Sequence, residues 1–445
     1  MTARSSRTRR ARLLVAPLAL GLAAVGFTVT PTSAATPPSP PSSGDAEADA
    51  TAPGGGPLDL RKGAVFSQSN DPAGNEVVAY ARAGNGRLTR IGSFSTDGTG
   101  SGGFEDSSNG VVLGRPMGEV SPNNNLQRGK RLFVTNAGSD TISVFKVLAD
   151  KLRLVQVQDS GAEKPVSVTV NDGVLYVLNS NEVRDGLVVP NCAPPNQSAV
   201  PSITGFTVGR GAKLEPIPGS TRKLSANSGC AQVSFNPSGT TLVVTERTAK
   251  VTGQAVGDEG VINTFQVEED GTLGTRRIYD ATSSGPFGFT FNKQGALLTS
   301  EQNDGLAGPG LGSAAGYRLA ANGTLSPSGP SARNGGTDSC WFVVTDNGKY
   351  GYVSSFFGQG QISSYHVSPD GAVALDASEA DEGNALPGSS DLSLSRKSDF
   401  LYSLNSFEGT IDAFAIGLNG SLELIDRDAA HEPSEMAAPL GLAAS

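Results

Sequence analysis

The feature that most constrains this chain of 445 residues is a short strand-and-turn unit that recurs seven times. Each copy begins with a small residue or Pro, continues as a short apolar strand and ends in a polar turn. The copies begin at Arg115, Lys164, Gly229, Gly285, Ser339, Ser390 and Ala438. Self-similarity at a fixed spacing, here about 45 to 65 residues, is typical of repeat architectures.

Two further patterns follow each copy. One is a second apolar strand, as in KRLFVTN and DFLYSLN, and the other is an alternating strand that ends in an Asn-Gly or Asp-Gly turn, as in VINTFQVEEDG. A further strand follows most of these turns. Alternating strands joined by such turns are β-hairpins, so each unit is predicted to be a four-stranded antiparallel sheet.

Seven four-stranded units at this period predict an all-β, seven-bladed β-propeller over residues 62–445. The ends support closure of a ring. The repeats begin with a second strand at Gly63–Ser67 and finish with a first strand at Pro439–Ala443, so the C-terminal strand should complete the N-terminal blade. The alternatives are a long β-sandwich or a solenoid. With 57 Gly and 27 Pro, a largely helical fold is disfavoured.

Residues 1–34 are typical of a secretory signal peptide, with five Arg, an apolar run and a small-residue cleavage site. The alternatives are an uncleaved membrane anchor and, from Arg9-Arg10, a twin-arginine signal. Residues 35–61 are rich in Pro, Ala, Ser and Gly and are predicted to be a disordered spacer. We therefore expect a secreted, extracellular protein that has no membrane contact after cleavage.

The mature chain would keep 29 Lys and Arg against 43 Asp and Glu, a formal charge of −14. Such a charge repels phosphate backbones, so nucleic acid is excluded as a partner. We expect a monomer with a small-molecule ligand and no cofactor. A protein or glycan ligand is the alternative. Only two His are present, so chemistry that needs a His cluster is disfavoured.

Three stretches carry a resemblance to known proteins: Leu242–Arg247 (LVVTER), Gly285–Phe291 (GPFGFTF) and Ser339–Ser355 (SCWFVVTDNGKYGYVSS). They resemble the lactonase-type seven-bladed propellers, which include 6-phosphogluconolactonase and 3-carboxymuconate cycloisomerase, and most of all their secreted bacterial members. The resemblance implies lactone hydrolysis or isomerisation. The muconate-cyclising members use a His in the cleft, whereas His366 here lies inside a strand and His431 in a loop.

Three consecutive units have long insertions between their second and third strands, at 179–201, 246–260 and 302–316. Insertions on one face of a repeat array are typical of a binding side, although drift in tolerated surface loops is the alternative. Polar residues should surround the channel mouth beneath these loops, where second strands end: Asn136, Asn179, Glu246, Glu301, Ser355 and Asn405.

A lactonase needs a base and a group that holds the oxyanion. We predict Glu246 and Glu301 as catalytic carboxylates and Arg247 and Arg115 as the positive charge. Asn136, Asn179, Glu119 and Asn405 are predicted binding residues. An Arg–Glu network that braces neighbouring blades is the alternative. No metal is predicted, since no calcium-binding spacing accompanies the carboxylates.

Cys192, Cys230 and Cys340 allow three pairings in an exported protein. The repeat register places Cys192 in a long loop and Cys230 at the start of the next innermost strand on the same face. This favours a Cys192–Cys230 disulfide and leaves Cys340 as a buried thiol. The leading functional hypothesis is a lactone hydrolase or isomerase. The alternative is a non-catalytic extracellular binding propeller, and one Trp disfavours a quinoprotein.

Overall fold

The computed structural model describes residues 58–445, apart from 104, 106, 115–130, 182–199, 210, 212, 227, 250–259, 304–307, 359, 386 and 430–439. The predicted signal peptide and nearly all of the predicted spacer lie outside the described residues. Within them, all regular structure is β-sheet, and no helix is long and apolar enough to cross a membrane.

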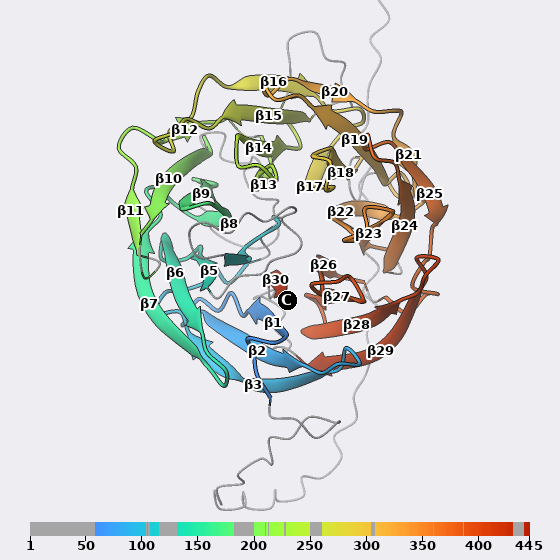
Figure 1. Ribbon diagram of the computed structural model, residues 1–445, viewed down its shortest axis with the longest axis horizontal. Helices are drawn as coiled ribbons and strands as arrows, with labels where there is room; N and C mark the ends of the chain where they lie inside the picture. Colours follow the sequence, from blue (N-terminus) through green and yellow to red (C-terminus); the bar gives the residue numbers. More distant parts are fainter. Residues whose placement is uncertain are drawn as a thin grey trace, which may run out of the picture. The chain divides into compact units, whose positions relative to one another are not determined.

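The described strands form seven antiparallel sheets arranged as a ring (Figure 1). We name them blades 1 to 7, with strands given from the innermost outward. Blades 1 and 2 consist of β30 (Leu440–Ala444), β1 (Ala64–Gln68), β2 (Glu76–Arg82) and β3 (Leu88–Ser95), and of β4 (Val111–Gly114), β5 (Arg131–Asn136), β6 (Thr141–Val147) and β7 (Leu152–Asp159). Blades 3 and 4 consist of β8 (Pro165–Asn171), β9 (Val174–Asn179), β10 (Ser202–Val208), β11 (Leu214–Pro216) and β12 (Arg222–Lys223), and of β13 (Cys230–Phe235), β14 (Thr241–Glu246), β15 (Val261–Gln266) and β16 (Arg277–Asp280).

Blades 5 and 6 consist of β17 (Pro286–Phe291), β18 (Leu297–Glu301), β19 (Ser313–Leu319), β20 (Leu325–Pro327) and β21 (Ala332–Arg333), and of β22 (Thr337–Val344), β23 (Tyr350–Phe357), β24 (Gln361–Val367) and β25 (Val373–Ala377). Blade 7 consists of β26 (Ser389–Leu394), β27 (Phe400–Asn405), β28 (Thr410–Ile416) and β29 (Leu422–Ala429).

The two ends of the propeller meet in blade 1, as the repeat register predicts. The C-terminal strand β30 is the innermost strand and pairs with β1, with Phe66 opposite Ala443. Ala64 N donates to Ser445 Oγ at 3.1 Å, and Ser445 N donates to Ala64 O at 2.9 Å. The fold is therefore the seven-bladed propeller that was predicted, closed by the C-terminal strand.

Two details differ from the sequence-based prediction. The innermost strand of blade 2 is Val111–Gly114, four residues before the predicted copy at Arg115, because the apolar Val111-Val112-Leu113 run forms the buried strand. In blades 3 and 5 the outermost strand is split into two short pieces that pair with the same third strand. Pro216 and Pro218 in blade 3, and Pro327 and Pro330 in blade 5, cannot donate to the ladder at these breaks.

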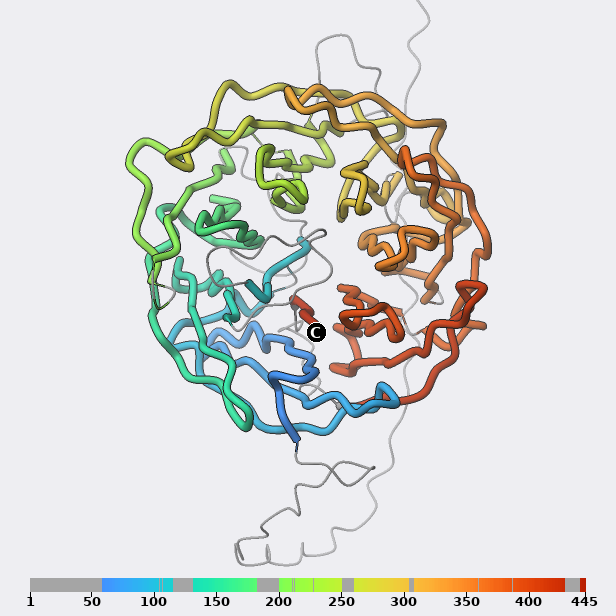
Figure 2. The backbone as a smooth tube through the Cα atoms, viewed as in Figure 1, coloured from blue at the N-terminus to red at the C-terminus, as the bar shows by residue number. Residues whose placement is uncertain are grey.

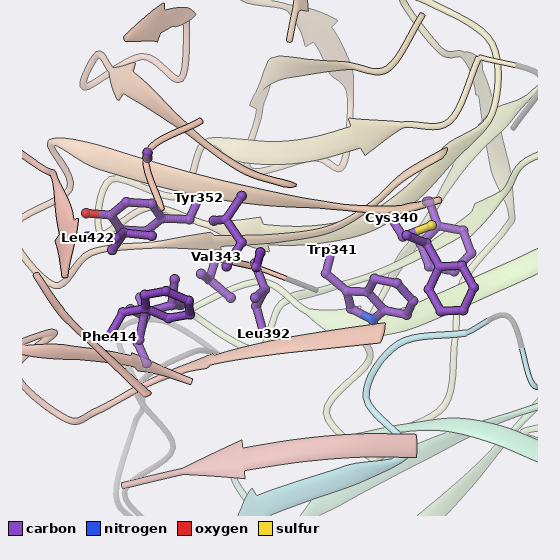
Figure 3. Packing of buried hydrophobic residues seen from close by; sticks show 14 of the residues in the cluster. Cys340, Trp341, Val343, Tyr352, Leu392, Phe414 and Leu422 are labelled. Carbon is purple, nitrogen blue, oxygen red and sulfur yellow. The ribbon is translucent and has the colours of Figure 1, made fainter. Parts of the chain in front are cut away.

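Neighbouring blades pack through apolar side chains that alternate along the strands, since successive residues point to opposite faces. Between blades 6 and 7, Trp341, Val343 and Tyr352 pack against Leu392 and Phe414 (Figure 3). Every one of these side chains is at most 4% exposed. The hydrophobic core is therefore divided into clusters that lie between neighbouring blades. The described innermost strands surround the centre of the ring (Figure 2).

Tyrosines in second strands add a hydrogen bond between blades. Tyr176 Oη donates to Gly271 O at 2.7 Å, and Tyr352 Oη donates to Gly420 O at 2.9 Å. Each acceptor lies in the turn before the outermost strand of a neighbouring blade. Both glycines have positive φ, the conformation that an Asp-Gly or Asn-Gly hairpin turn requires.

Candidate functional site

We call the side of the ring where second strands end and first strands begin the loop face. The six polar residues predicted there do end their second strands or lie next to the end. All six are buried, at 1% exposure or less, and most bond to neighbouring loops: Asn136, Asn179, Glu246, Glu301, Ser355 and Asn405. They are packed within the loop face, so the contacts of each carboxylate determine what it can do.

Glu246 at the end of β14 is held by four donors. Its Oε1 accepts from Ser225 N at 2.8 Å, and its Oε2 accepts from Ser225 Oγ at 3.2 Å and from Asn263 Nδ2 at 2.8 Å. Arg276 Nη2 forms an ion pair with the same Oε2 at 2.5 Å. Arg276 also donates to Asn263 Oδ1 at 2.8 Å. The network ties the end of β14 to β15, to Arg276 before β16 and to Ser225 in the connection that leads from blade 3 into blade 4. Whether Glu246 acts catalytically or braces the blades stays a prediction.

Glu301 at the end of β18 occupies the matching position in blade 5 but has different partners. Oε1 accepts from Ser283 N at 2.9 Å and from Ser331 Oγ at 3.1 Å, and Oε2 accepts from Ser313 Oγ at 2.6 Å. Burial raises the pKa of this carboxyl, while the serine hydrogen bonds and the charge of Arg333 lower it by less. Glu301 is therefore protonated more readily than an exposed glutamate.

Arg247 follows Glu246 directly and lies in a different environment. Its Nη1 donates to Gln302 Oε1 at 3.1 Å, and its guanidinium lies 5.9 Å from the ring centre of Phe287 on β17. Gln302 Nε2 in turn contacts Cys340 Sγ at 3.3 Å. Arg247 is 6% exposed. The structure therefore joins blades 4, 5 and 6 through a cation, an amide and a thiol beside their innermost strands.

Aromatic rings continue this cluster across blade 6. Phe287 and Trp341 meet edge to face, with ring centres 5.3 Å apart, and Trp341 lies 6.2 Å from Phe356. The indole Nε1 of Trp341 is buried and has no hydrogen-bond partner among the described residues. Sequence reasoning missed Gln302, Phe287 and Trp341 as site residues. Gln302 directly follows the second strand β18 and Phe287 is the second residue of the first strand β17, whereas Trp341 lies inside the first strand β22.

The three predicted binding asparagines have unequal partners. Asn136 donates to Thr141 Oγ1 at 3.0 Å and to Ser143 Oγ at 2.8 Å. Asn179 donates to Ser160 O at 3.3 Å. Asn405 Oδ1 accepts from Phe407 N at 3.2 Å and from Glu408 N at 3.1 Å. All three amides shape loops, and their role in binding a ligand stays a prediction.

Several predictions fall outside the described residues. Arg115, Glu119, Cys192 and His431 are among them, as are the interiors of the three long insertions. The third insertion ends earlier than predicted, because the β19 strand begins at Ser313. Cys230 is disulfide-bonded and Cys340 is a buried free cysteine. The pairing of Cys230 with Cys192 stays a prediction.

A stretch before β4 crosses between blades near the centre of the ring. Ser108 N donates to Ala231 O at 3.1 Å in blade 4, and Val168 N in blade 3 donates to Asn109 O at 3.0 Å. The buried Asp391 carboxylate of blade 7 accepts from the backbone of Asn109 and, at 3.2 Å, from Leu442 N of the closing strand. Sequence analysis gave no signal for this crossing, because the contacts come from backbone groups.

The remaining titratable side chains add little to the site. His366 is exposed and contacts Asp376 at 3.1 Å on the outer strands of blade 6. Among the described residues, no group of three or more His, Cys, Asp or Glu could hold a metal ion.

Fold and site geometry together define an all-β propeller with a polar cluster on its loop face. Among solved structures, it is similar to a candidate 6-phosphogluconolactonase of Bacteroides fragilis, with a TM-score of 0.59 and 14% identity over 86% of this chain and 98% of that one. The corresponding structure from Bacteroides uniformis has a TM-score of 0.60 and 13% identity over 86% and 99%. The periplasmic gluconolactonase of Pseudomonas aeruginosa has a TM-score of 0.58 and 13% identity over 86% and 98%.

At these identities the likeness concerns the fold. No protein-family model matches the chain, and no curated protein matches it in sequence. The chain is thus a seven-bladed propeller with the architecture of the lactonase-type structures.

Proposed function

We propose that this protein is an exported, lactonase-like propeller that opens a small lactone at the loop face. The observation that carries the proposal is the position of Arg247. Its guanidinium lies between Gln302 and the ring of Phe287, where the innermost strands of blades 4 and 5 begin. A buried cation in a partly dry environment stabilises a developing oxyanion more strongly than a solvated one.

In this proposal Arg247 holds the carbonyl oxygen of the lactone while a carboxylate takes a proton from the attacking water. The tetrahedral intermediate then expels the ring oxygen, which takes a proton and becomes the hydroxyl of the product. Glu301 is the base in this proposal, because its described hydrogen bonds come from serines and burial raises the pKa of its carboxyl. Glu246 is engaged by the Arg276 guanidinium.

A second candidate is a non-catalytic propeller that binds a small molecule at the same cluster. It is favoured by one observation: Glu246 and Glu301 are both 0% exposed and already accept several hydrogen bonds. In this case Arg247 and Gln302 would bind a carbonyl or carboxylate ligand without turnover.

A hydrolysis panel of δ-gluconolactone, γ-butyrolactone, dihydrocoumarin and an N-acyl-homoserine lactone distinguishes the candidates. We expect the wild type to hydrolyse at least one lactone and Arg247→Met to lose about 100-fold or more in kcat/KM. Arg318→Met, which removes an exposed ion pair between β19 and Asp370 in the β24–β25 turn, is the matched control and should retain activity. Calorimetric binding of the same lactones without turnover supports the binding candidate.

The carboxylate is tested separately. Glu301→Gln should lose most of the activity, and Glu246→Gln should retain it when assayed below its unfolding temperature. If Arg247→Met and Glu301→Gln both hydrolyse the panel at the wild-type rate, the assigned site is wrong. If the wild type neither hydrolyses nor binds any lactone, the proposed function fails.

A further inference from the structure

A second candidate site lies in the turn between β27 and β28 of blade 7. This tight turn carries Phe407, whose side chain is 49% exposed, followed by the exposed Glu408. Phe407 lies 5.0 Å from Phe356 and 6.4 Å from Phe357, measured between ring centres. Phe357 is itself half-buried. Two phenylalanines from adjacent blades are thus presented together on the loop face.

The exposed ring is fixed in place by its surroundings. Asn405 Oδ1 accepts from the backbone N–H groups of Phe407 and Glu408, which sets the turn. Gly388 lies against the ring: a Cβ there would come within 2.6 Å of Phe407 Cδ2. Gly388 N also donates to Phe356 O at 2.7 Å. A rigid, solvent-facing aromatic ring loses little conformational entropy when a ligand binds.

Blade 2 provides an internal comparison, because its matching turn has the same length and strand pairing. There, Asn136 Nδ2 donates to Thr141 Oγ1 and Ser143 Oγ. In blade 7 the matching Asn405 Nδ2 and Thr410 Oγ1 are buried and have no hydrogen-bond partner among the described residues. Buried polar groups are normally satisfied, so the blade 7 turn leaves two buried donors unpaired in the described part of the chain where blade 2 pairs the matching groups.

The two turns also differ in the residue at the position of Phe407. Blade 2 has Gly138 there, and a Cβ at Gly138 would collide with Gly100 O from the blade 1 loop that covers the turn. Gly138 N donates to Thr99 O at 3.0 Å across this contact. The turn in blade 2 is therefore closed by its neighbour, whereas the turn in blade 7 presents an aromatic ring to solvent.

We propose that the Phe407 turn, together with Phe357, is a binding site for a neutral pyranose ring. The C–H face of a pyranose packs on aromatic rings, and its hydroxyls both donate and accept. The site offers both functions: Asn405 Nδ2 and Thr410 Oγ1 donate, and the Glu408 carboxylate accepts. Arg427 Nη2, held by Asp412 at 2.9 Å, brings a positive charge close to Glu408. The two carboxylates outnumber this one guanidinium, so the turn disfavours an anionic ligand. The proposed sugar site uses neither Arg247 nor Glu301, the groups assigned to the proposed lactone chemistry.

Binding is tested by calorimetry and ligand-observed NMR on the full propeller with chitohexaose, maltohexaose, mannohexaose and xylohexaose. We expect one or more of these to bind, and Phe407→Gly, which copies the blade 2 turn, to weaken binding about tenfold or more. Phe407→Leu should fall between the two. Leu418→Ser removes a fully exposed apolar side chain in the turn at the opposite end of β28 and should bind as the wild type does.

Thr410→Val isolates the hydrogen-bonding part of the site, since it keeps the shape and removes the hydroxyl. It should weaken binding while the circular dichroism spectrum and melting temperature stay at wild-type values. The proposal is overturned if none of the four oligosaccharides binds, or if Phe407→Gly and Thr410→Val both bind like the wild type. Lactone hydrolysis by Phe407→Gly should be unchanged, so failure of this site leaves the proposed function standing.

Discussion

Tyr402 Oη donates a hydrogen bond of 2.9 Å to Gly86 O, across the junction where the last blade meets the first. Tyr402 lies on β27 of blade 7, and Gly86 lies in the turn between β2 and β3 of blade 1. The same bond joins Tyr176 to Gly271 and Tyr352 to Gly420. Ring closure is therefore stabilised by the strand pairing of β30 and by the same tyrosine–glycine hydrogen bond that joins other neighbouring blades.

Tyr402→Phe should lower the free energy of unfolding by about 1 to 2 kcal/mol, because the buried Gly86 carbonyl loses its side-chain donor. Chemical denaturation measures the change. Tyr279→Phe is the matched control: Tyr279 Oη bonds Gly323 O at 3.3 Å, but Thr264 Oγ1 also donates to that oxygen, at 2.7 Å. Equal losses in the two variants would contradict the assigned role.

Asp391 makes stability depend on pH. Burial raises the pKa of this carboxyl to about 8, and the backbone donors Leu442, Leu392 and Asn109 lower it by less. The folded protein therefore binds a proton that the unfolded chain releases between about pH 4 and pH 8. This contribution is fully present below pH 4 and is lost as pH rises to 8.

Unfolding of the wild type and Asp391→Asn across pH 4 to 9 tests this linkage. The wild type should lose stability relative to the variant up to about pH 8, with no further relative loss above it. The variant should be less stable in absolute terms at low pH, since its amide N–H group faces the N–H of Leu442 or Leu392. A pH-independent difference would show that Asp391 stays ionised when folded.

The two loop-face carboxylates should differ in their contribution to stability. Glu246→Gln leaves Arg276 without its ion-pair partner in a largely buried position, so we expect a loss of about 2 to 4 kcal/mol. Glu301→Gln keeps an oxygen for the serine donors and should lose about 1 kcal/mol or less. Thermal unfolding of both variants measures the difference, and a larger loss in Glu301→Gln would contradict it.

The sequence predicts the fold well because each blade repeats the same local signals. Alternating strands and Gly turns place second strands such as TTLVVTE (240–246) almost to the residue, and β14 spans Thr241–Glu246. The failures are local. Arg115 begins a recurring pattern that predicts the start of an innermost strand, whereas the buried Val111–Gly114 run forms the strand.

The candidate site is harder to predict from the sequence, because the direction of a side chain and its contacts with other blades do not depend on the local sequence alone. Glu246 and Arg247 are adjacent in sequence, yet one bonds within blade 4 and the other contacts blade 5. The unequal partners of Asn136 and Asn405 depend on neighbouring loops, so identical positions in the repeat acquire different chemistry. The repeat therefore predicts where a residue lies in its blade, whereas contacts with the surrounding blades determine what its side chain can do.

The disulfide can be assigned chemically. Peptide mapping without reduction should find Cys192 linked to Cys230 and Cys340 as a thiol that reacts only after unfolding, since Cys340 is fully buried. Reduction should lower the free energy of unfolding by about 2 to 4 kcal/mol. A peptide that contains Cys340 in a disulfide would overturn the pairing.

One glycine in a third strand tests whether the spacing between blades requires glycine. Gly316 lies in β19 of blade 5, and a Cβ at this position would overlap the carbonyl oxygen of Gly371 in the turn of blade 6. Gly316→Ala should therefore push blades 5 and 6 apart locally and lower the free energy of unfolding by about 1 to 3 kcal/mol.

Gly74→Ala is the control, because an added Cβ there meets nothing within 4 Å and its φ is not positive. That variant should keep or slightly raise the stability, since Ala restricts the unfolded chain. Calorimetric unfolding of both proteins compares them. Equal stabilities would mean that the approach of blades 5 and 6 is loose enough to admit a methyl group. A loss confined to Gly316→Ala would show that glycine is required in this third strand by the spacing between blades.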